Sequence, residues 1–268
     1  LKGLTHSIIA VLPIDFESDE KINKKIFAFL MTFIIGTAAY ALNFSVAPTG
    51  FKVELKKPVT QEVYIINNTP APLRIETYME AAESFEDFNL NNNITVFPKM
   101  ISIKPGSKQT IRFRVKPDAN MTDGEYRSLL IFKEVPQEIK TVVTTNQNNK
   151  GLSTELTFIT EVAIGVSGTK GKSIIDGTAQ NIKVSYAGQI LSLKCDTTSK
   201  GNTAMRIDYI LENESGKVIS EGRLGTSART GEKKLSTSIE APELKGKKVK
   251  LILKDQNNKT IYSGTNSL

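Results

Sequence analysis

The stretch from Phe97 to Pro136 constrains the fold more than any other part of the chain. Apolar and polar residues alternate there in three runs, and two turn signals, Pro105-Gly106 and Asp118 to Gly124, separate the runs. The clearest run alternates apolar with basic side chains: Ile111, Arg112, Phe113, Arg114, Val115 and Lys116. A period of two is typical of a strand with one buried and one solvated face. The stretch therefore predicts three consecutive strands.

A tyrosine opens the third of these runs. Tyr126 follows the Asp123-Gly124 turn and precedes the apolar segment Leu129 to Phe132. A tyrosine in this place is typical of immunoglobulin-like sandwiches, where its ring fills the core and its hydroxyl bonds to the backbone of the corner. We therefore predict such a sandwich. A simple β-meander is the alternative that the same pattern allows.

The length of the chain suits two sandwiches. The 268 residues exceed what one sandwich needs, since such a domain has about 100 residues. We predict an all-β protein with two immunoglobulin-like β-sandwich domains after an N-terminal signal peptide. The expected divisions are 1–41 for an upstream segment and the signal peptide, 42–167 for the first domain and 168–268 for the second. Residues Ser167 to Ser173, SGTKGKS, are expected to form the linker.

The segment Lys21 to Ala41 has the pattern of a secretory signal. Three lysines precede an apolar stretch from Ile26 to Ile35, and Ala39-Tyr40-Ala41 has the small residues of a cleavage site. We expect cleavage after Ala41, export to the periplasm and no membrane span in the mature chain. An uncleaved anchor is the alternative. Residues 1–20 do not belong to this pattern and are left out of the fold prediction.

Composition narrows the possible functions. The single cysteine, Cys195, can form no internal disulfide and is expected to be a small buried residue, and the single histidine, His6, lies before the signal segment. The sequence thus predicts no zinc cluster, no other metal, no cofactor and no enzymatic activity. Residues 168–268 carry 17 basic against 10 acidic side chains, which accounts for the net charge of +7. They could meet an acidic partner or be simply solvated. No basic run is interleaved with aromatics, so nucleic acid is not expected.

Two further segments of the first domain are predicted to be strands at the edges of its sheets. Leu42 to Leu55 is predicted to be a first edge strand with a kink at Pro48. Leu152 to Val166 is predicted to be one long strand after a polar loop, Gln137 to Gly151. Its apolar side chains fall on one face, and its length makes it a candidate for pairing with another chain.

The second domain has its own predicted strand set. Two segments look alike, ILENESGKVISEG from Ile210 and ILKDQNNKTIYSG from Ile252, and each reads as a strand, a polar turn and a return strand. We interpret the likeness as shared hairpin chemistry rather than a repeat. The expected strands are Ile182–Tyr186, Ile190–Leu193, Arg206–Leu211, Val218–Ile219, Leu235–Ile239, Val249–Leu253 and Ile261–Tyr262.

Two segments of the first domain match a known family pattern: Ile101 to Arg112, ISIKPGSKQTIR, and Asp123 to Glu134, DGEYRSLLIFKE. Through them the sequence resembles the periplasmic chaperones of the chaperone–usher pilus pathway. The resemblance implies a non-enzymatic protein that caps secreted pilin-like or surface subunits by donor-strand complementation, with an outer-membrane usher as a further partner. By that analogy Leu152, Leu156 and Phe158 would be the side chains donated to the subunit.

The sequence departs from the family at the pair of cations that grips the subunit's terminal carboxylate. Gly50 stands at the arginine position, and Val162 or Ala163 stands at the lysine position. Lys52, two residues along and on the same face as Gly50, is the substitute that the sequence offers. The departure keeps a second function open, a structural or adhesive cell-envelope module that binds wall polymer or a surface protein.

Overall fold

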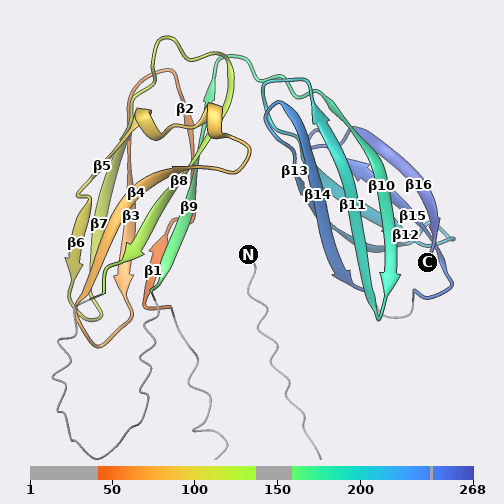
Figure 1. Ribbon diagram of the computed structural model, residues 1–268, viewed down its shortest axis with the longest axis horizontal. Helices are drawn as coiled ribbons and strands as arrows, with labels where there is room; N and C mark the ends of the chain where they lie inside the picture. The colour runs from red at the N-terminus through yellow and green to blue at the C-terminus, as the bar shows by residue number, and fades with distance from the viewer. Residues whose placement is uncertain (1–41, 137–158, 242–243) are drawn as a thin grey trace, which may run out of the picture. The chain divides into compact units, whose positions relative to one another are not determined.

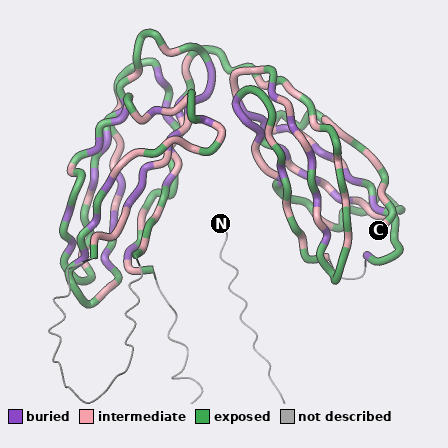
Figure 2. Tube along the Cα trace, viewed as in Figure 1, coloured by how far each residue is buried: buried purple, intermediate pink, exposed green. Residues whose placement is uncertain are grey.

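The described part of the chain folds into strands joined by turns, with two short 3-10 helices. A computed structural model describes residues 42–136, 159–241 and 244–268 (Figure 1). Within these ranges Leu42–Leu268 forms one compact unit, with two separate hydrophobic cores, one in each half. Buried and exposed residues alternate along the strands (Figure 2). The all-β class and the two sandwiches predicted from the sequence are both confirmed.

The first sandwich consists of two sheets. One has the strand order β1-β3-β7-β5 and the other the order β2-β9-β8-β4-β6. In chain order the strands are β1 (Phe44–Ala47), β2 (Gly50–Glu54), β3 (Val59–Asn67), β4 (Leu73–Ala81), β5 (Ile94–Phe97), β6 (Met100–Ile103), β7 (Lys108–Val115), β8 (Gly124–Glu134) and β9 (Glu161–Lys170). In β7, Ile111, Phe113 and Val115 are buried while the arginines between them are exposed. The alternation read from the sequence therefore sets which face of β7 joins the core.

Tyr126 forms the predicted tyrosine corner. Its side chain is buried in the first core, and its hydroxyl donates a hydrogen bond to the backbone carbonyl of Thr122 at 2.9 Å. The bond ties the start of β8 to the turn that precedes it. The same turn contains Gly124, whose φ of 123° is a conformation that a residue with a Cβ rarely adopts.

The predicted first strand is two strands on different sheets. β1 pairs antiparallel with β3, whereas β2 pairs parallel with β9. Pro48 lies between them, and because proline has no backbone N–H it cannot continue the ladder of β1. The prediction of a single kinked edge strand was therefore wrong. The acidic segment after β4 forms two short 3-10 helices, η1 (Glu86–Phe88) and η2 (Asn91–Asn93).

The second sandwich also has two sheets, in the orders β10-β11-β14 and β13-β12-β15-β16. Each of its seven strands contains one of the predicted ones and is longer at one or both ends. They are β10 (Gly177–Ala187), β11 (Ile190–Ser199), β12 (Arg206–Glu212), β13 (Val218–Thr226), β14 (Gly231–Glu240), β15 (Lys248–Lys254) and β16 (Thr260–Ser267). Cys195 is buried in the core of this sandwich, as expected.

The two look-alike segments form hairpins with the same turn. Asn213 accepts hydrogen bonds at its Oδ1 from the backbone N–H groups two and four residues ahead, at 3.1 and 2.9 Å. Asp255 does the same with its own Oδ1, at 2.8 and 2.9 Å. Gly216 and Asn258 occupy the same place in the two turns, and both have positive φ values, 78° and 63°. Shared hairpin chemistry is confirmed.

Arg229 contacts the corner of the first sandwich from the second. It is buried, and it donates from Nε to the carbonyl of Asn202 at 3.0 Å and from Nη2 to the carbonyl of Asp123 at 2.7 Å. Its guanidinium also lies over the rings of Phe88 and Tyr126, at 3.6 and 4.7 Å from their centroids. Among the described residues its Nη1 has no hydrogen-bond partner.

Candidate functional site at the edge of strand β9

Strand β9 has two neighbours for only part of its length. On one side it pairs with β8 from Glu161 to Lys170. On the other side β2 begins only at the level of Gly165 and covers β9 from there to Thr169. Within the described part of the chain, the segment from Glu161 to Ile164 has no strand on that second side. This half of β9 is an open sheet edge.

The backbone groups that face this open side belong to alternate residues. Thr160 accepts a hydrogen bond from the N–H of Glu134 at the β8 side, whereas Thr169 accepts one from Leu55 at the β2 side. Because N–H and C=O groups along a strand point alternately to its two neighbours, the odd-numbered residues face β2 or the space before it. Glu161 and Ala163 therefore direct their backbone donors and acceptors to the open edge.

The side chains of β9 follow the predicted alternation. Ile164 and Val166 are buried in the core of their own sandwich, Val162 is half-buried, and Glu161 and Ala163 are exposed. The one-sided apolar face expected for this strand is thus confirmed from Val162 onward. The predicted donor residues Leu152, Leu156 and Phe158, and the predicted loop before them, lie outside the described residues.

The end of β9 differs from the prediction. The strand continues to Lys170, so that the first four residues of the expected linker, from Ser167, belong to the sheet. A Cβ added to Gly168 would come within 2.8 Å of the Leu55 side chain. Gly168 is therefore needed for close packing rather than for a flexible connection, and composition alone does not separate these two uses of glycine.

Lys52, the predicted substitute cation, lies on β2 with an exposed side chain. It is level with Ser167, whereas Gly50 is level with Gly165 at the first paired position. Phe51 and Val53 point into the sandwich, so Lys52 lies on the outer face, as does Gly50. Among the described residues Lys52 forms no ion pair.

A second cation, which was not singled out from the sequence, lies closer to the open edge. Lys133 of β8 is the direct partner of Glu161, and their side chains approach to 3.8 Å between Nζ and Oε2. Tyr78 of β4 lies beside the same carboxylate, 3.5 Å away. Burial and the nearby Glu161 charge raise the pKa of Tyr78 above its ordinary value. The sequence offered one indication of Lys133, because this residue lies in the segment Asp123 to Glu134, on which the family resemblance rests.

The described ranges hold no group of three or more His, Cys, Asp or Glu side chains with the geometry to bind a metal ion. In the same ranges no helix is long and apolar enough to cross a membrane. The open edge offers backbone hydrogen-bonding groups flanked by charged side chains. An open sheet edge of this kind can pair with an extended chain.

The match to a protein family concerns the half of the molecule that contains β9. Residues 44–162 match the family described as pili and flagellar-assembly chaperones, PapD N-terminal domain. No curated protein matches the sequence.

Solved structures with similar folds share little sequence with this chain. The Salmonella enterica SafA pilin in complex with the SafB chaperone aligns at 16% identity and a TM-score of 0.44, over 86% of this chain and 99% of that one. The YadV chaperone aligns at 15% and 0.47, over 85% and 100%. The Pseudomonas aeruginosa CupB2 chaperone aligns at 12% and 0.43, over 84% and 100%.

Proposed function

We propose that this chain, whose residues 44–162 match the family of pili and flagellar-assembly chaperones, caps secreted pilin-like or surface subunits by donor-strand complementation. The subunit would be a sandwich that lacks a strand, and β9 with the residues before it would supply the missing partner. The protein acts by binding and not by catalysis. The observation that carries the proposal is the half of β9 that pairs with β8 alone.

The open edge supports this role through its backbone. Glu161 and Ala163 present two N–H and two C=O groups, each worth roughly 0.5–1.5 kcal/mol when it is bonded to a strand of the subunit. Upstream, Leu152, Leu156 and Phe158 are proposed to enter the groove that the missing strand leaves. At about 25 cal/mol per Å2, each large apolar side chain would contribute roughly 1.5–3 kcal/mol. Side-chain burial would then supply most of the affinity, and the backbone hydrogen bonds would set the register of the subunit strand against β9.

The proposal places the mature protein in the periplasm, with the signal peptide removed after Ala41. An outer-membrane usher is the proposed acceptor of the capped subunit. Lys52 is proposed to hold the subunit's terminal carboxylate, since it is an exposed cation on the strand that borders the open edge.

The donor-strand proposal predicts that acidic substitutions upstream of β9 abolish capping. The probe is a purified pilin-like subunit whose sandwich lacks its last strand, mixed with this protein and resolved by size-exclusion chromatography. We expect a one-to-one complex with the wild type and a loss of affinity of more than about tenfold with Leu156→Asp or Phe158→Asp, because each places a charge in an apolar groove.

The matched control is Ile174→Asp, since Ile174 is an exposed apolar residue in the segment between β9 and β10. This variant should bind the subunit as the wild type does. A complex that survives both donor-strand substitutions, or that is lost equally in the control, would contradict capping by β9.

The anchor proposal predicts a smaller effect at Lys52. In the same assay Lys52→Gln should weaken the complex about two- to fivefold, the size expected for one exposed ion pair. Blocking the subunit's terminal carboxylate as an amide should remove the difference between Lys52→Gln and the wild type. Lys57→Gln, an exposed lysine in the turn after β2, serves as the control. Equal weakening by both variants would mean that the overall positive charge of the protein, and not a contact between Lys52 and the carboxylate, strengthens the complex.

The excess of basic residues in the second half favours a second candidate function, an adhesive cell-envelope module that binds wall polymer or a surface protein. Such binding would be electrostatic and would weaken as salt screens the charges. Sedimentation of the purified protein with cell walls at low and at high salt tests it. Salt-sensitive co-sedimentation without a subunit complex would favour this function over capping.

A further inference from the structure

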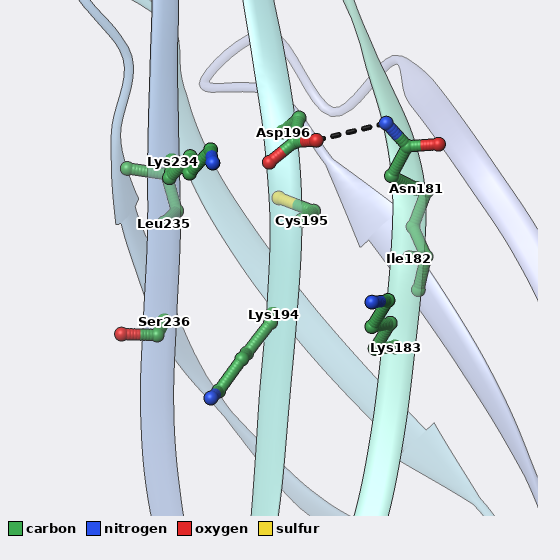
Figure 3. A pocket seen from close by; sticks show the side chains of 9 residues that line it. All are labelled: Asn181, Ile182, Lys183, Lys194, Cys195, Asp196, Lys234, Leu235 and Ser236. Carbon is green, nitrogen blue, oxygen red and sulfur yellow. Dashed lines mark hydrogen bonds between the residues drawn. The ribbon is translucent and has the colours of Figure 1, made fainter.

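The second sandwich has a recess on the outer face of its three-stranded sheet (Figure 3). Its volume is about 490 Å3. Three lysines line it, one from each of the neighbouring strands β10, β11 and β14, together with one carboxylate. These residues are Lys183, Lys194, Lys234 and Asp196.

The lysines are brought together by the register of the sheet. Lys183 and Lys194 are direct partners across β10 and β11, and Lys234 is the direct partner of Asp196 across β11 and β14. None of the three lysines forms an ion pair with any described residue. Like charges directly opposite each other destabilise a sheet. The recess therefore holds two opposed cations and a net charge of about +2 with no internal compensation beyond Asp196.

A β-bulge creates this arrangement. The register of β10 against β11 shifts between Gln180 and Lys183, so that one extra residue is inserted into β10. Without the shift Ile182 would face Lys194, and Lys183 would point into the core. A slip of one residue exchanges the two faces of a strand, and the bulge is thus what puts Lys183 on the outer face beside Lys194.

The bulge is held by a polar contact inside the recess. Asn181 adopts a φ of 54°, a conformation that asparagine tolerates better than most residues. Its Nδ2 donates a hydrogen bond to Asp196 Oδ2 at 2.8 Å. The single carboxylate of the recess is therefore engaged in fixing the backbone that positions Lys183. Bulges of this kind commonly re-aim a side chain next to a functional site.

We infer that this recess binds a phosphate group, either as free phosphate or as a phosphate monoester. A phosphate carries a charge of about −1.5 to −2 near pH 7 and three strong acceptor oxygens, which matches the number of lysines and the net charge of the recess. A bound phosphate would also relieve the repulsion between Lys183 and Lys194. The site lies on the second sandwich, apart from β9, so the inference and the proposed capping function stand or fall separately.

Amide chemical-shift titration of the full mature chain tests the inference. Inorganic phosphate and glucose 6-phosphate are the probes, each added at constant ionic strength with sodium chloride as the balancing salt. We expect saturable shifts concentrated at residues 181–183, 194–196 and 234–236. Binding of both probes indicates recognition of the phosphate group itself, whereas preference for the sugar phosphate indicates an ester as the natural ligand.

Substitutions that change the charge of the recess test whether its positive charge binds the phosphate. Lys183→Gln, Lys194→Gln and Lys234→Gln should each weaken phosphate binding about two- to fivefold, and the triple variant more than about tenfold. Lys194→Arg should retain binding because it keeps the charge. Asp196→Asn should strengthen binding about two- to fivefold, since it removes a repelling charge while an amide oxygen can still accept from Asn181.

The control is Lys217→Gln, an exposed lysine in the turn between β12 and β13, which should leave the affinity unchanged. Shifts that do not saturate, an equal loss in the Lys217 variant, or an Asp196→Asn variant that binds no better would each overturn the inference. The amide spectrum itself reports whether each variant is folded. Should a lysine variant unfold, the comparison of Lys194→Arg and Asp196→Asn with the wild type decides the outcome.

Discussion

Cys195 shows how burial controls the chemistry of one residue. Its side chain is 2% exposed in the second core. Burial, with a smaller effect of the neighbouring Asp196 charge, raises the pKa of the Cys195 thiol from 9.0 to about 11. The thiolate is the reactive form of cysteine. In the folded protein Cys195 is therefore a small apolar residue and not a nucleophile, although it is the only thiol in the chain.

The raised pKa predicts a loss of stability in alkali. Above pH 9.0 the thiol ionises in the unfolded chain but not in the folded one, so its contribution is full below pH 9.0 and is lost as the pH rises through about 11. The total is about 2–3 kcal/mol. We expect the free energy of unfolding of the wild type to fall more steeply between these pH values than that of Cys195→Ala. Parallel pH profiles of the two proteins in urea unfolding would contradict this.

Tyr126 illustrates a single residue that could be assigned a structural role from the sequence. Its position after a turn predicted both the buried ring and the hydroxyl bond to the backbone, and both are present. The signal is local, because the hydroxyl reaches only four residues back to Thr122. Arg229, which stacks on the same ring, gave no such signal, because its partners are about a hundred residues away in the chain.

At the scale of elements, the twin hairpin turns allow a matched experiment. Gly216 and Asn258 adopt left-handed conformations at the same place in the two turns, and a Cβ added at Gly216 would meet no other atom within 4 Å. Gly216→Ala should therefore lower the free energy of unfolding by about 1 kcal/mol through backbone strain alone.

Gly216→Asn is the control for this prediction and should cost less than Gly216→Ala, because the other turn already carries asparagine there. Urea unfolding midpoints measure both. If alanine proved neutral at this position, or as costly as asparagine, the turn would not depend on the left-handed conformation.

The strands show which part of a sheet a sequence can predict. The buried face of β7 could be predicted from the alternation of apolar and polar residues, because successive residues of the strand lie on opposite faces. The separation of β1 from β2 could not, because β2 pairs with residues that follow it by more than a hundred positions. The bulge in β10 was not predicted either, because it is defined by which residues of β11 lie opposite and a single strand does not contain that information.

At the scale of the whole molecule, Arg229 connects the two sandwiches. Its hydrogen bonds to Asn202 and Asp123 and its contacts with Phe88 and Tyr126 join residues of both sandwiches. Two further bonds made by Glu125 span the same junction, one from its backbone N–H to Asn202 and one to its carboxylate from Ala204. The sandwiches are therefore expected to unfold as a single cooperative system.

Removal of the Arg229 side chain should weaken that cooperativity. Arg229→Met deletes two strong hydrogen bonds and the contacts with two aromatic rings, which together amount to about 2–4 kcal/mol. We expect a lower melting temperature and two resolved transitions by calorimetry in place of one. Arg229→Lys keeps the charge but not the forked donors, so its melting temperature should lie between those of the wild type and Arg229→Met. An unchanged single transition in Arg229→Met would show that the remaining contacts suffice.

For the candidate site, the sequence predicted a strand with one apolar face but not the boundaries of that strand. The apolar face of β9 was evident from Val162, Ile164 and Val166. Whether a strand edge is open depends on where its neighbour starts, and that is decided by the pairing of Gly50 with Gly165. No local pattern carries this information.

The start of β2 has a consequence for any molecule that pairs with β9. Gly50 already occupies the space beside Gly165, so a foreign strand that advances along β9 from its free half can go no further than Ile164. The position at which such a strand must end is thus fixed by the start of β2 and is the same for every partner. Partners of unrelated sequence would therefore be bound with the ends of their paired strands at the same position along β9.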